Sequence, residues 1–179
     1  PTESHARQVV HKPDQPPSCR GILALSRSTM SDTRPYTGHF DGPRHLFAVR
    51  VYFEDTDFSG VVYHSRYLHF MERARSDMLS VAGIAQREAY EGGEGVYAVA
   101  DLHIKYRAPA HFDDALLVVS TVEEIRGASV VIHQRVMRGE QVLTEAEVTA
   151  AFLTPEGRPR RQPREWLAAF EGIKAGRNG

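Results

Sequence analysis

The chain has 179 residues, which is enough for one domain with a sizeable core. Its 41% hydrophobic and 25% charged residues are typical of a globular protein, and its net charge of −1 argues against steering towards nucleic acid or an anionic membrane. One cysteine, Cys19, excludes an intrachain disulfide framework and a thiolate metal site. No apolar run approaches the roughly 20 residues of a membrane helix. We therefore predict a cytoplasmic protein that neither binds nucleic acid nor inserts into a membrane.

Residues 1–43 mix Pro, Ser, Arg and Gly without sustained periodicity. Such a composition buries too little apolar surface to offset the entropy of ordering, so we predict a disordered segment or an N-terminal extension. Met30 is followed by the polar run "SDTRP", which raises the hypothesis that translation naturally starts there. We expect the folded domain over residues 44–172 and a flexible tail over residues 173–179.

Order is expected to begin with a strand in "HLFAVRVYFE". There Phe47, Val49, Val51 and Phe53 alternate with other residues at the period of a half-buried strand. An acidic loop follows, and then a long helix over "SRYLHFMERARSDMLSVAG", with Ser65 as the expected N-cap and Gly83 as the stop. The apolar positions of this helix recur at helical spacing, at Tyr67, Met71, Ala74, Met78 and Ala82.

The apolar period changes to two after "EGGEG". Val96, Ala98, Ala100, Leu102, Ile104 and Tyr106 alternate with a mostly polar set that ends in His103, Lys105 and Arg107. The segments "ALLVVSTVEEI", "ASVVIHQRVM" and "QVLTEAEVTAAFL" are joined by tight turns, so these strands should be antiparallel. "PREWLAAFEGI" predicts a short closing helix. An apolar sheet face and a single long amphipathic helix predict an α+β domain in which the sheet wraps around the helix.

The acidic loop "EDTDFSGVVYH", residues 54–64, raises the question of a metal. Asp55, Asp57, Ser59 and Gly60 match the start of a calcium loop, but position 12 of that loop requires a bidentate Glu and is Arg66 here. The histidines likewise lack the spacing and the cysteine support of a zinc site. We therefore predict no metal and no cofactor.

The loop and the helix together resemble a known family. "VRVYFEDTDFSGVVYHSRYLHFMERAR" is similar to the signature of hotdog-fold thioesterases of the 4-hydroxybenzoyl-CoA thioesterase type, in the YbgC-like branch associated with the Tol-Pal system. The core pattern is T-D-x-x-G-V-V-Y-H-x-x-Y, continued by E-x-A-R. Downstream, "IKYRAPAHFDDALLV" extends the resemblance to roughly residues 45–155. Relatives often carry Tyr at the position of Phe53, so that hydroxyl is missing here.

The resemblance implies a hotdog fold, with a five-stranded antiparallel sheet around one central helix. It also implies a homodimer or homotetramer with active sites at subunit interfaces, and a role in lipid metabolism. Its branch places the catalytic carboxylate at Asp57, acting as nucleophile or general base, and the oxyanion donor at the backbone N–H of His64. The first turn of a helix suits that second role, because its N–H groups are unpaired. The bland alternative is that Asp57 only orders the turn.

Further site residues are expected around this pair. The His64 side chain is a second catalytic candidate. Gly60 allows close approach of the acyl group, Val61, Val62 and Tyr63 would form the pocket wall, and Lys105 and Arg107 would bind the CoA phosphates. Glu54 and Asp55 are expected to pair with Arg73 or Arg75. Glu72 matches a helix carboxylate that is catalytic in another hotdog lineage, but we interpret it as an interface or ion-pair residue.

The leading hypothesis is an acyl-CoA thioesterase that hydrolyses short-chain or aromatic acyl-CoA to free acid and CoA. Acyl carrier protein is a further candidate partner. Two alternatives stay open: a hotdog hydratase or dehydratase acting on acyl-CoA or acyl carrier protein, and a non-catalytic acyl-CoA-binding module. Consumption of added acyl-CoA, as opposed to thermal stabilisation alone, separates the enzymes from the binding module.

Overall fold

The computed structural model describes residues 36–177. The segment up to residue 35, with the hypothetical start at Met30, lies outside the described residues. The described chain begins at Tyr36 and forms its first strand ahead of residue 44, where the sequence predicted the domain to begin. Within residues 36–177, none of the helices has the length and apolar character that a bilayer crossing demands.

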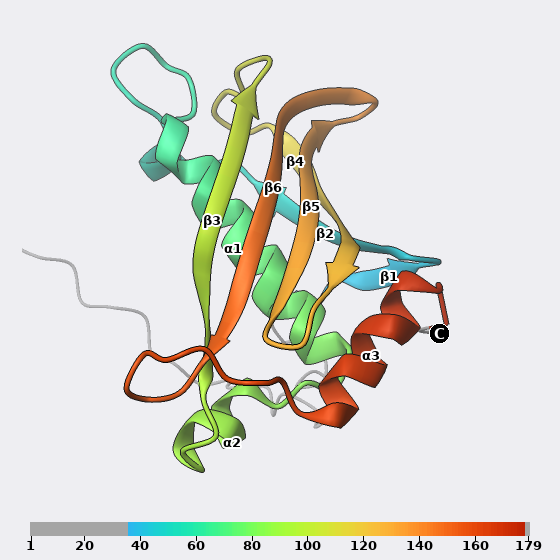
Figure 1. Ribbon diagram of the computed structural model, residues 1–179. Coiled ribbons are helices and arrows are strands. Elements are labelled where there is room, and N and C mark those ends of the chain that lie inside the picture. Colours follow the sequence, from blue (N-terminus) through green and yellow to red (C-terminus); the bar gives the residue numbers. More distant parts are fainter. Residues whose placement is uncertain (1–35, 178–179) are drawn as a thin grey trace, which may run out of the picture. The chain divides into compact units, whose positions relative to one another are not determined.

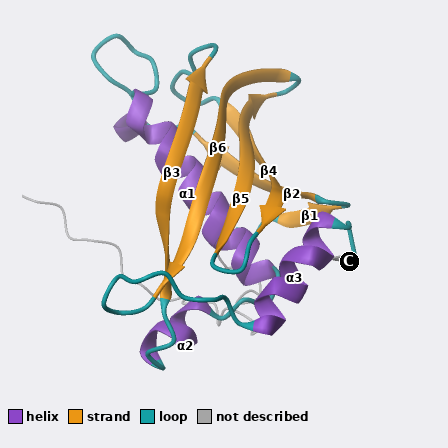
Figure 2. Ribbon diagram, viewed as in Figure 1, coloured by secondary structure: helices purple, strands orange, loops and turns teal. Residues whose placement is uncertain are grey.

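The described part is an α+β unit in which one antiparallel sheet curves along one side of a long helix (Figures 1 and 2). The sheet has six strands in the order β1-β2-β4-β5-β6-β3. Their bounds are β1 His39–Asp41, β2 Arg44–Arg50, β3 Val96–Tyr106, β4 Ala115–Ile125, β5 Ser129–Arg138 and β6 Gln141–Leu153. The helices are α1 His64–Val81, α2 Gln86–Glu91 and α3 Arg164–Lys174.

The predicted class and the central helix are confirmed, but the count of five strands was wrong. The additional strand is β1, which pairs with β2 through a tight turn. Gly42 occupies that turn at φ +57°, a conformation that glycine adopts without the penalty other residues meet. β1 occupies one edge of the sheet, and the eleven-residue strand β3 occupies the other.

The first predicted strand is shorter than expected. It ends at Arg50, and Phe53 lies in a 3-10 turn over Phe53–Asp55 with 82% of its surface exposed. The Asp55 carboxylate accepts a hydrogen bond from the Tyr52 N–H at 2.9 Å, which turns the chain out of the extended conformation. The alternation of apolar residues continues through Phe53 in the sequence, but this hydrogen bond between a side chain and the backbone ends the strand earlier.

α1 begins at His64, and its N-cap is Tyr63 and not Ser65 as expected. It ends at Val81, and Gly83 follows at φ +74°, so the predicted stop is confirmed. Four of the five predicted apolar positions are buried in α1, and two residues that the pattern omitted join them. The fifth, Ala82, is the half-buried C-cap. The buried residues of α1 are Tyr67, Phe70, Met71, Ala74, Met78 and Leu79.

β3 contains a bulge that interrupts the predicted alternation. The register with β6 shifts between Val99 and Asp101, so that Val99 is opposite Ala150 and Leu102 is opposite Val148. Ala150 and Val148 lie two residues apart and therefore face the same side of the sheet. Val99 and Leu102 therefore face the same side of the sheet although they are three residues apart. The predicted unbroken alternation from Val96 to Tyr106 was wrong.

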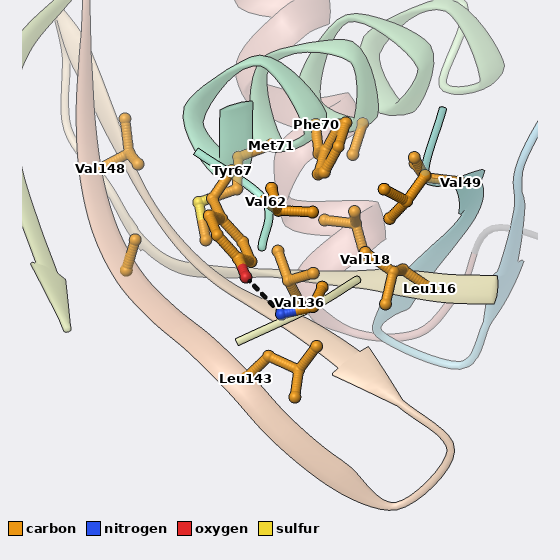
Figure 3. Close-up of a cluster of buried hydrophobic side chains, with 14 residues drawn as sticks. Val49, Val62, Tyr67, Phe70, Met71, Leu116, Val118, Val136, Leu143 and Val148 are labelled. Atoms are coloured by element: carbon orange, nitrogen blue, oxygen red, sulfur yellow. Dashed lines mark hydrogen bonds between the residues drawn. The ribbon is translucent and has the colours of Figure 1, made fainter. Parts of the chain in front are cut away.

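The core has two parts, one under each half of α1. Under the N-terminal half, Tyr67 reaches from α1 into a cluster of Val, Leu and Met side chains (Figure 3). Its phenolic oxygen accepts a hydrogen bond from the Ala110 N–H at 2.8 Å. Under the C-terminal half, Met78 packs with Trp166, Phe170 and Ile173, all of which come from α3.

Candidate active site

The acidic loop closes on itself before it enters α1. The Asp57 N–H donates to the Val61 carbonyl at 2.9 Å, and Thr56 forms an isolated antiparallel β-bridge with Val62. Gly60 makes the reversal possible at φ +80°. The Val62 N–H then donates to the Ala110 carbonyl at 2.8 Å, which ties the loop to the chain that follows β3. Asp57 is thereby held across from residues that lie two to three positions before the start of α1.

Asp57 is exposed, and its carboxylate is held by one residue. Ser59 donates twice to Oδ1, from its backbone N–H at 2.8 Å and from its hydroxyl at 2.5 Å. These hydrogen bonds favour the ionised form, so the Ser59 hydroxyl, followed by the Ser59 N–H, lowers the pKa of Asp57 below its ordinary value. None of the hydrogen bonds within residues 36–177 ends on Oδ2 of Asp57. The site therefore presents an ionised, oriented carboxylate with one oxygen available.

His64 is the first residue of α1. Among the described residues no hydrogen-bond acceptor faces its backbone N–H, as expected at a helix start. Its carbonyl accepts a hydrogen bond from the Tyr106 hydroxyl at 3.0 Å, and its ring lies 4.3 Å from the ring of Tyr63. The end of β3 therefore fixes the first turn of α1, where the unpaired N–H and the positive end of the helix dipole coincide.

A cleft of about 780 Å³ opens beside Asp57. It is lined by Asp57, Thr56, Gly60 and three aromatic side chains, Phe53, Phe58 and Phe112. The ring centroids of Phe53 and Phe112 are 6.4 Å apart in an edge-to-face arrangement. A carboxylate next to exposed aromatic rings suits a substrate with a polar reacting centre and an apolar body.

The residues predicted to form the pocket wall and those predicted to bind the CoA phosphates lie in different parts of the structure. Val62 is buried in the core with 4% exposure, Val61 bridges His111, and Tyr63 is 48% exposed beside His64. Lys105 and Arg107 do not line the Asp57 cleft. They lie in a separate hollow of about 300 Å³ with His133 and Glu145, and Arg107 forms an ion pair with Glu145.

The comparisons with known proteins identify the family. The Thioesterase superfamily matches residues 59–145, a range that begins two residues after Asp57. The acyl-CoA thioesterase YbgC of Haemophilus influenzae is 42% identical over 129 residues, which are 72% of this chain and 95% of that relative. This chain belongs to the thioesterase superfamily.

Two further similarities support the assignment of this thioesterase. The acyl-CoA thioester hydrolase YbgC of Escherichia coli strain CFT073 is 39% identical over 125 residues, 69% of this chain and 92% of that relative. The crystal structure of a probable thioesterase from Bartonella henselae superposes with a TM-score of 0.64 at 39% identity, covering 67% of this chain and 99% of that one. The resemblance to hotdog thioesterases, the hotdog fold and the enzyme class are confirmed.

The carboxylates and cations around the thioesterase loop do not pair as predicted. Asp55 is buried, and its partner is Arg66, whose Nε lies 3.5 Å from Oδ1. The expected partners Arg73 and Arg75 were wrong, because Arg75 turns towards the sheet and donates to Gln134 at 2.7 Å. Over residues 36–177, no three or more His, Cys, Asp or Glu side chains gather into a possible metal site.

Sequence reasoning missed three site residues, Ser59, Phe58 and Phe112. Ser59 carried a usable signal, since a Ser two residues after an Asp commonly donates back to that carboxylate in an Asx-type turn. In a calcium loop the Ser59 oxygen would be a metal ligand, whereas here the hydroxyl donates to Asp57. Phe112 comes from the segment between β3 and β4, and only the tertiary fold brings it to the loop.

We predict that Ser59→Ala moves the acid limb of the kcat/KM profile of this thioesterase to higher pH. Without the hydroxyl donor the pKa of Asp57 rises from its lowered value, so the carboxylate protonates earlier as the pH falls. Above that limb the rate should stay close to wild type. The measurement is kcat/KM against pH, with the exposed helix residue Ser80 replaced in Ser80→Ala as the control. An acid limb at the same pH in wild type and Ser59→Ala would show that Asp57 does not set it.

Proposed function

We propose that this thioesterase hydrolyses acyl-CoA to a free acid and CoA in the Asp57 cleft, with short-chain or aromatic acyl groups as its substrates. The proposal rests above all on one observation. One short segment carries both an ionised carboxylate with a free oxygen, at Asp57, and the unpaired N–H of a helix start, seven residues later at His64, in a chain whose relatives are named acyl-CoA thioesterases. Thioester hydrolysis needs those two groups together.

Asp57 has two routes to the same products. As a nucleophile, Oδ2 attacks the thioester carbon and the C–S bond breaks. CoA departs as the thiolate, and the mixed anhydride that remains on Asp57 is then cleaved by water. As a general base, Asp57 takes a proton from a water molecule that attacks the same carbon. In both routes the carbonyl oxygen becomes negative, and the His64 N–H would donate to it. The net reaction consumes one water and releases one carboxylic acid and one thiol.

Phe53, Phe58 and Phe112 support an apolar or aromatic acyl group. All three are more than half exposed, at 82%, 109% and 59%, and all three line the Asp57 cleft. Exposed aromatic rings gathered at one place commonly mark a contact surface, because leaving them in water forgoes favourable burial. The acyl group would cover these rings while the carbonyl approaches His64.

The proposal is tested by thiol release from a panel of acyl-CoA thioesters, from acetyl to palmitoyl and including benzoyl. We expect turnover of at least one short-chain or aromatic member. A protein that consumes none of the panel, but is stabilised against heat by a member of it, would be a binding module and not this enzyme.

We further propose that the enzyme assembles through the β3 edge into a homodimer or a larger homo-oligomer. Within residues 36–177, β3 pairs only with β6, and it is eleven residues long. Val96, Val99 and Leu102 remain 42%, 52% and 38% exposed along it. A long apolar edge is a ready site for pairing with another strand, and a second copy of β3 supplies a matching one.

We predict that Val99→Lys combined with Leu102→Lys lowers the solution mass measured by light scattering to that of one chain. The charges would be buried and unpaired in a β3–β3 interface, which disfavours association. Val81→Lys, at an exposed position on α1, is the control and should keep the wild-type mass. A monomeric wild type would overturn the proposed assembly.

Acyl carrier protein as a second acyl donor, the Tol-Pal association, a role in lipid metabolism and a cytoplasmic location stay predictions from the sequence. Thiol release from an acylated carrier protein, measured beside the same acyl-CoA, tests the first of these directly.

A further inference from the structure

His45 is a titratable side chain that the proposed reaction does not use. It lies in β2 and is fully buried, and its Nε2 is 2.8 Å from Oδ2 of Asp77. The Asp77 side chain comes from α1 and is only 13% exposed. The same carboxylate oxygen accepts a hydrogen bond from the Gly38 N–H at 2.9 Å. One oxygen of α1 therefore contacts both β2 and the residue that directly precedes β1.

The chain ahead of β1 passes very close to this pair. A Cβ atom at Gly38 would lie 2.5 Å from the Leu46 carbonyl oxygen and 2.7 Å from both Asp77 Oδ2 and His45 Nε2, so no side chain fits there. The Phe40 ring of β1 packs edge-to-face against the imidazole, with the ring centroids 5.3 Å apart. β1 itself pairs with β2 over only three residues. The contacts around His45 are therefore a large part of what holds β1 in place.

The geometry suits a neutral imidazole. A carboxylate oxygen that already accepts the Gly38 N–H is an acceptor, so Nε2 of His45 carries the proton and donates to it. Nδ1 is buried, and none of the protein groups within residues 36–177 forms a hydrogen bond with it. Protonation would place an N–H donor at Nδ1 without a protein acceptor, which is costly in a buried position. The docked form of β1 therefore favours neutral His45.

The charges around His45 agree with this preference. Burial has the largest effect and lowers the pKa of His45, whereas the hydrogen bond and the charge of Asp77 raise it. His39 of β1 lowers the pKa of His45 further. The two remaining charged side chains of the hairpin, Asp41 and Arg44, are exposed and form an ion pair with each other.

The other strands and helices near His45 supply little charge. β4 places the uncharged Ser120 directly opposite His45. On α3, the Lys174 ammonium donates to the Glu123 carbonyl of β4. Among the described residues, Asp77 and His39 are thus the two charged or titratable groups that act on His45.

We propose that His45 and Asp77 form an acid-sensitive latch, in which protonation of His45 releases β1 and the residues ahead of it from α1. The released state binds more protons than the docked state, because only the released imidazole has its ordinary pKa of 6.5. The docked form is therefore fully stable above pH 6.5 and weakens as the pH falls below it, by at most about tenfold for each pH unit. Release uncovers the edge of β2, whose backbone groups then lack a strand partner and are open to pairing.

The test is amide hydrogen exchange of the full chain at pH 7.5 and pH 5.0, expressed as protection factors, which remove the intrinsic effect of pH on exchange. We expect the protection of residues 38–41 to fall at least about fivefold at pH 5.0, within the limit of about thirtyfold set by the distance of that pH from 6.5. The amides of β6, a central strand, should keep their protection within about twofold. A smaller fall over residues 38–41, or an equal fall in β6, would overturn the proposal.

Two variants assign the effect to one histidine. His45→Gln does not titrate but keeps a side-chain N–H that can donate to Asp77, so its protection factors should agree within about twofold at the two pH values. His39→Gln removes the exposed histidine of β1 and should keep the wild-type fall. A persisting fall in His45→Gln, or its loss in His39→Gln, would contradict the role of His45.

A measurement on wild type decides the case if His45→Gln fails to dock β1. Nitrogen NMR of the His45 ring at pH 7.5 should show the neutral form with its proton on Nε2. An imidazolium, or a neutral ring with its proton on Nδ1, would overturn the proposal, because the latch requires that acid adds the second proton. None of these measurements depends on the proposed thioesterase reaction.

Discussion

Asp57→Asn is expected to lower kcat/KM for acyl-CoA hydrolysis by about 10²–10⁴, the range that a positioned carboxylate contributes as acid–base or nucleophilic catalyst. The amide is nearly the same size and can still accept the two hydrogen bonds from Ser59. It carries no charge, so it neither attacks the thioester carbon nor takes a proton from water. The loss should therefore fall on kcat rather than on the stability of the fold.

Glu54→Gln is the matched control for that measurement. Glu54 is an exposed carboxylate three positions earlier in the same loop, and it contributes its backbone carbonyl, not its side chain, to the contact with Arg66. We expect its kcat/KM to stay within about twofold of wild type, as for other exposed residues without a chemical role. Equal losses in both variants would indicate a general effect of loop charge and would remove Asp57 from the mechanism.

Tyr67→Phe is expected to lower the free energy of unfolding by about 1–3 kcal/mol, because it leaves a buried N–H without its acceptor. Ala110 is fully buried, and its N–H donates to the Tyr67 oxygen at 2.8 Å in the centre of the core cluster (Figure 3). The carbonyl of the same residue accepts the Val62 N–H. One hydrogen bond to a side chain of α1 therefore supports the segment that holds the Asp57 loop.

The effect of Tyr67→Phe should reach the activity as well. Displacement of Ala110 shifts Val62 and the Asp57 turn paired to it, so kcat should fall together with stability. Urea unfolding and kcat measured on the same preparations check both parts. The control is Tyr90→Phe on α2, whose exposed hydroxyl has no hydrogen-bond partner among the described residues. It should change the stability by no more than about 0.5 kcal/mol and the rate by no more than the equivalent factor. A fully stable Tyr67→Phe would contradict the role of this bond.

The sequence predicted those parts of the fold that depend on local pattern. The helical spacing of Tyr67, Met71, Ala74 and Met78 is borne out by their burial, and Gly83 follows the end of α1 as expected. The errors arose where one local contact overrides the pattern. The Asp55 carboxylate turns the chain at Phe53, and the bulge near Asp101 changes which side of β3 is apolar.

The candidate site divides in the same way. Asp57, Gly60 and His64 lie within eight consecutive residues, so a linear motif was enough to select them. Phe112 joins the cleft only through the packing of the segment after β3, and Arg75 meets Gln134 across 59 positions of sequence. Neither contact follows from residue spacing, because it depends on how the sheet curves around α1. Lys105 and Arg107 were selected only as a basic pair near a strand end. That pattern does not indicate which hollow the pair faces.

The most direct test of the central claim compares consumption and binding of one acyl-CoA by wild type and by Asp57→Asn. The substrate is the panel member that wild type turns over fastest. Its consumption is measured as thiol release, and its binding is measured as the thermal shift that it produces. We predict rapid thiol release by wild type, and a thermal shift without comparable release in the variant. Undiminished thiol release by folded Asp57→Asn would contradict the assignment of hydrolysis to this cleft.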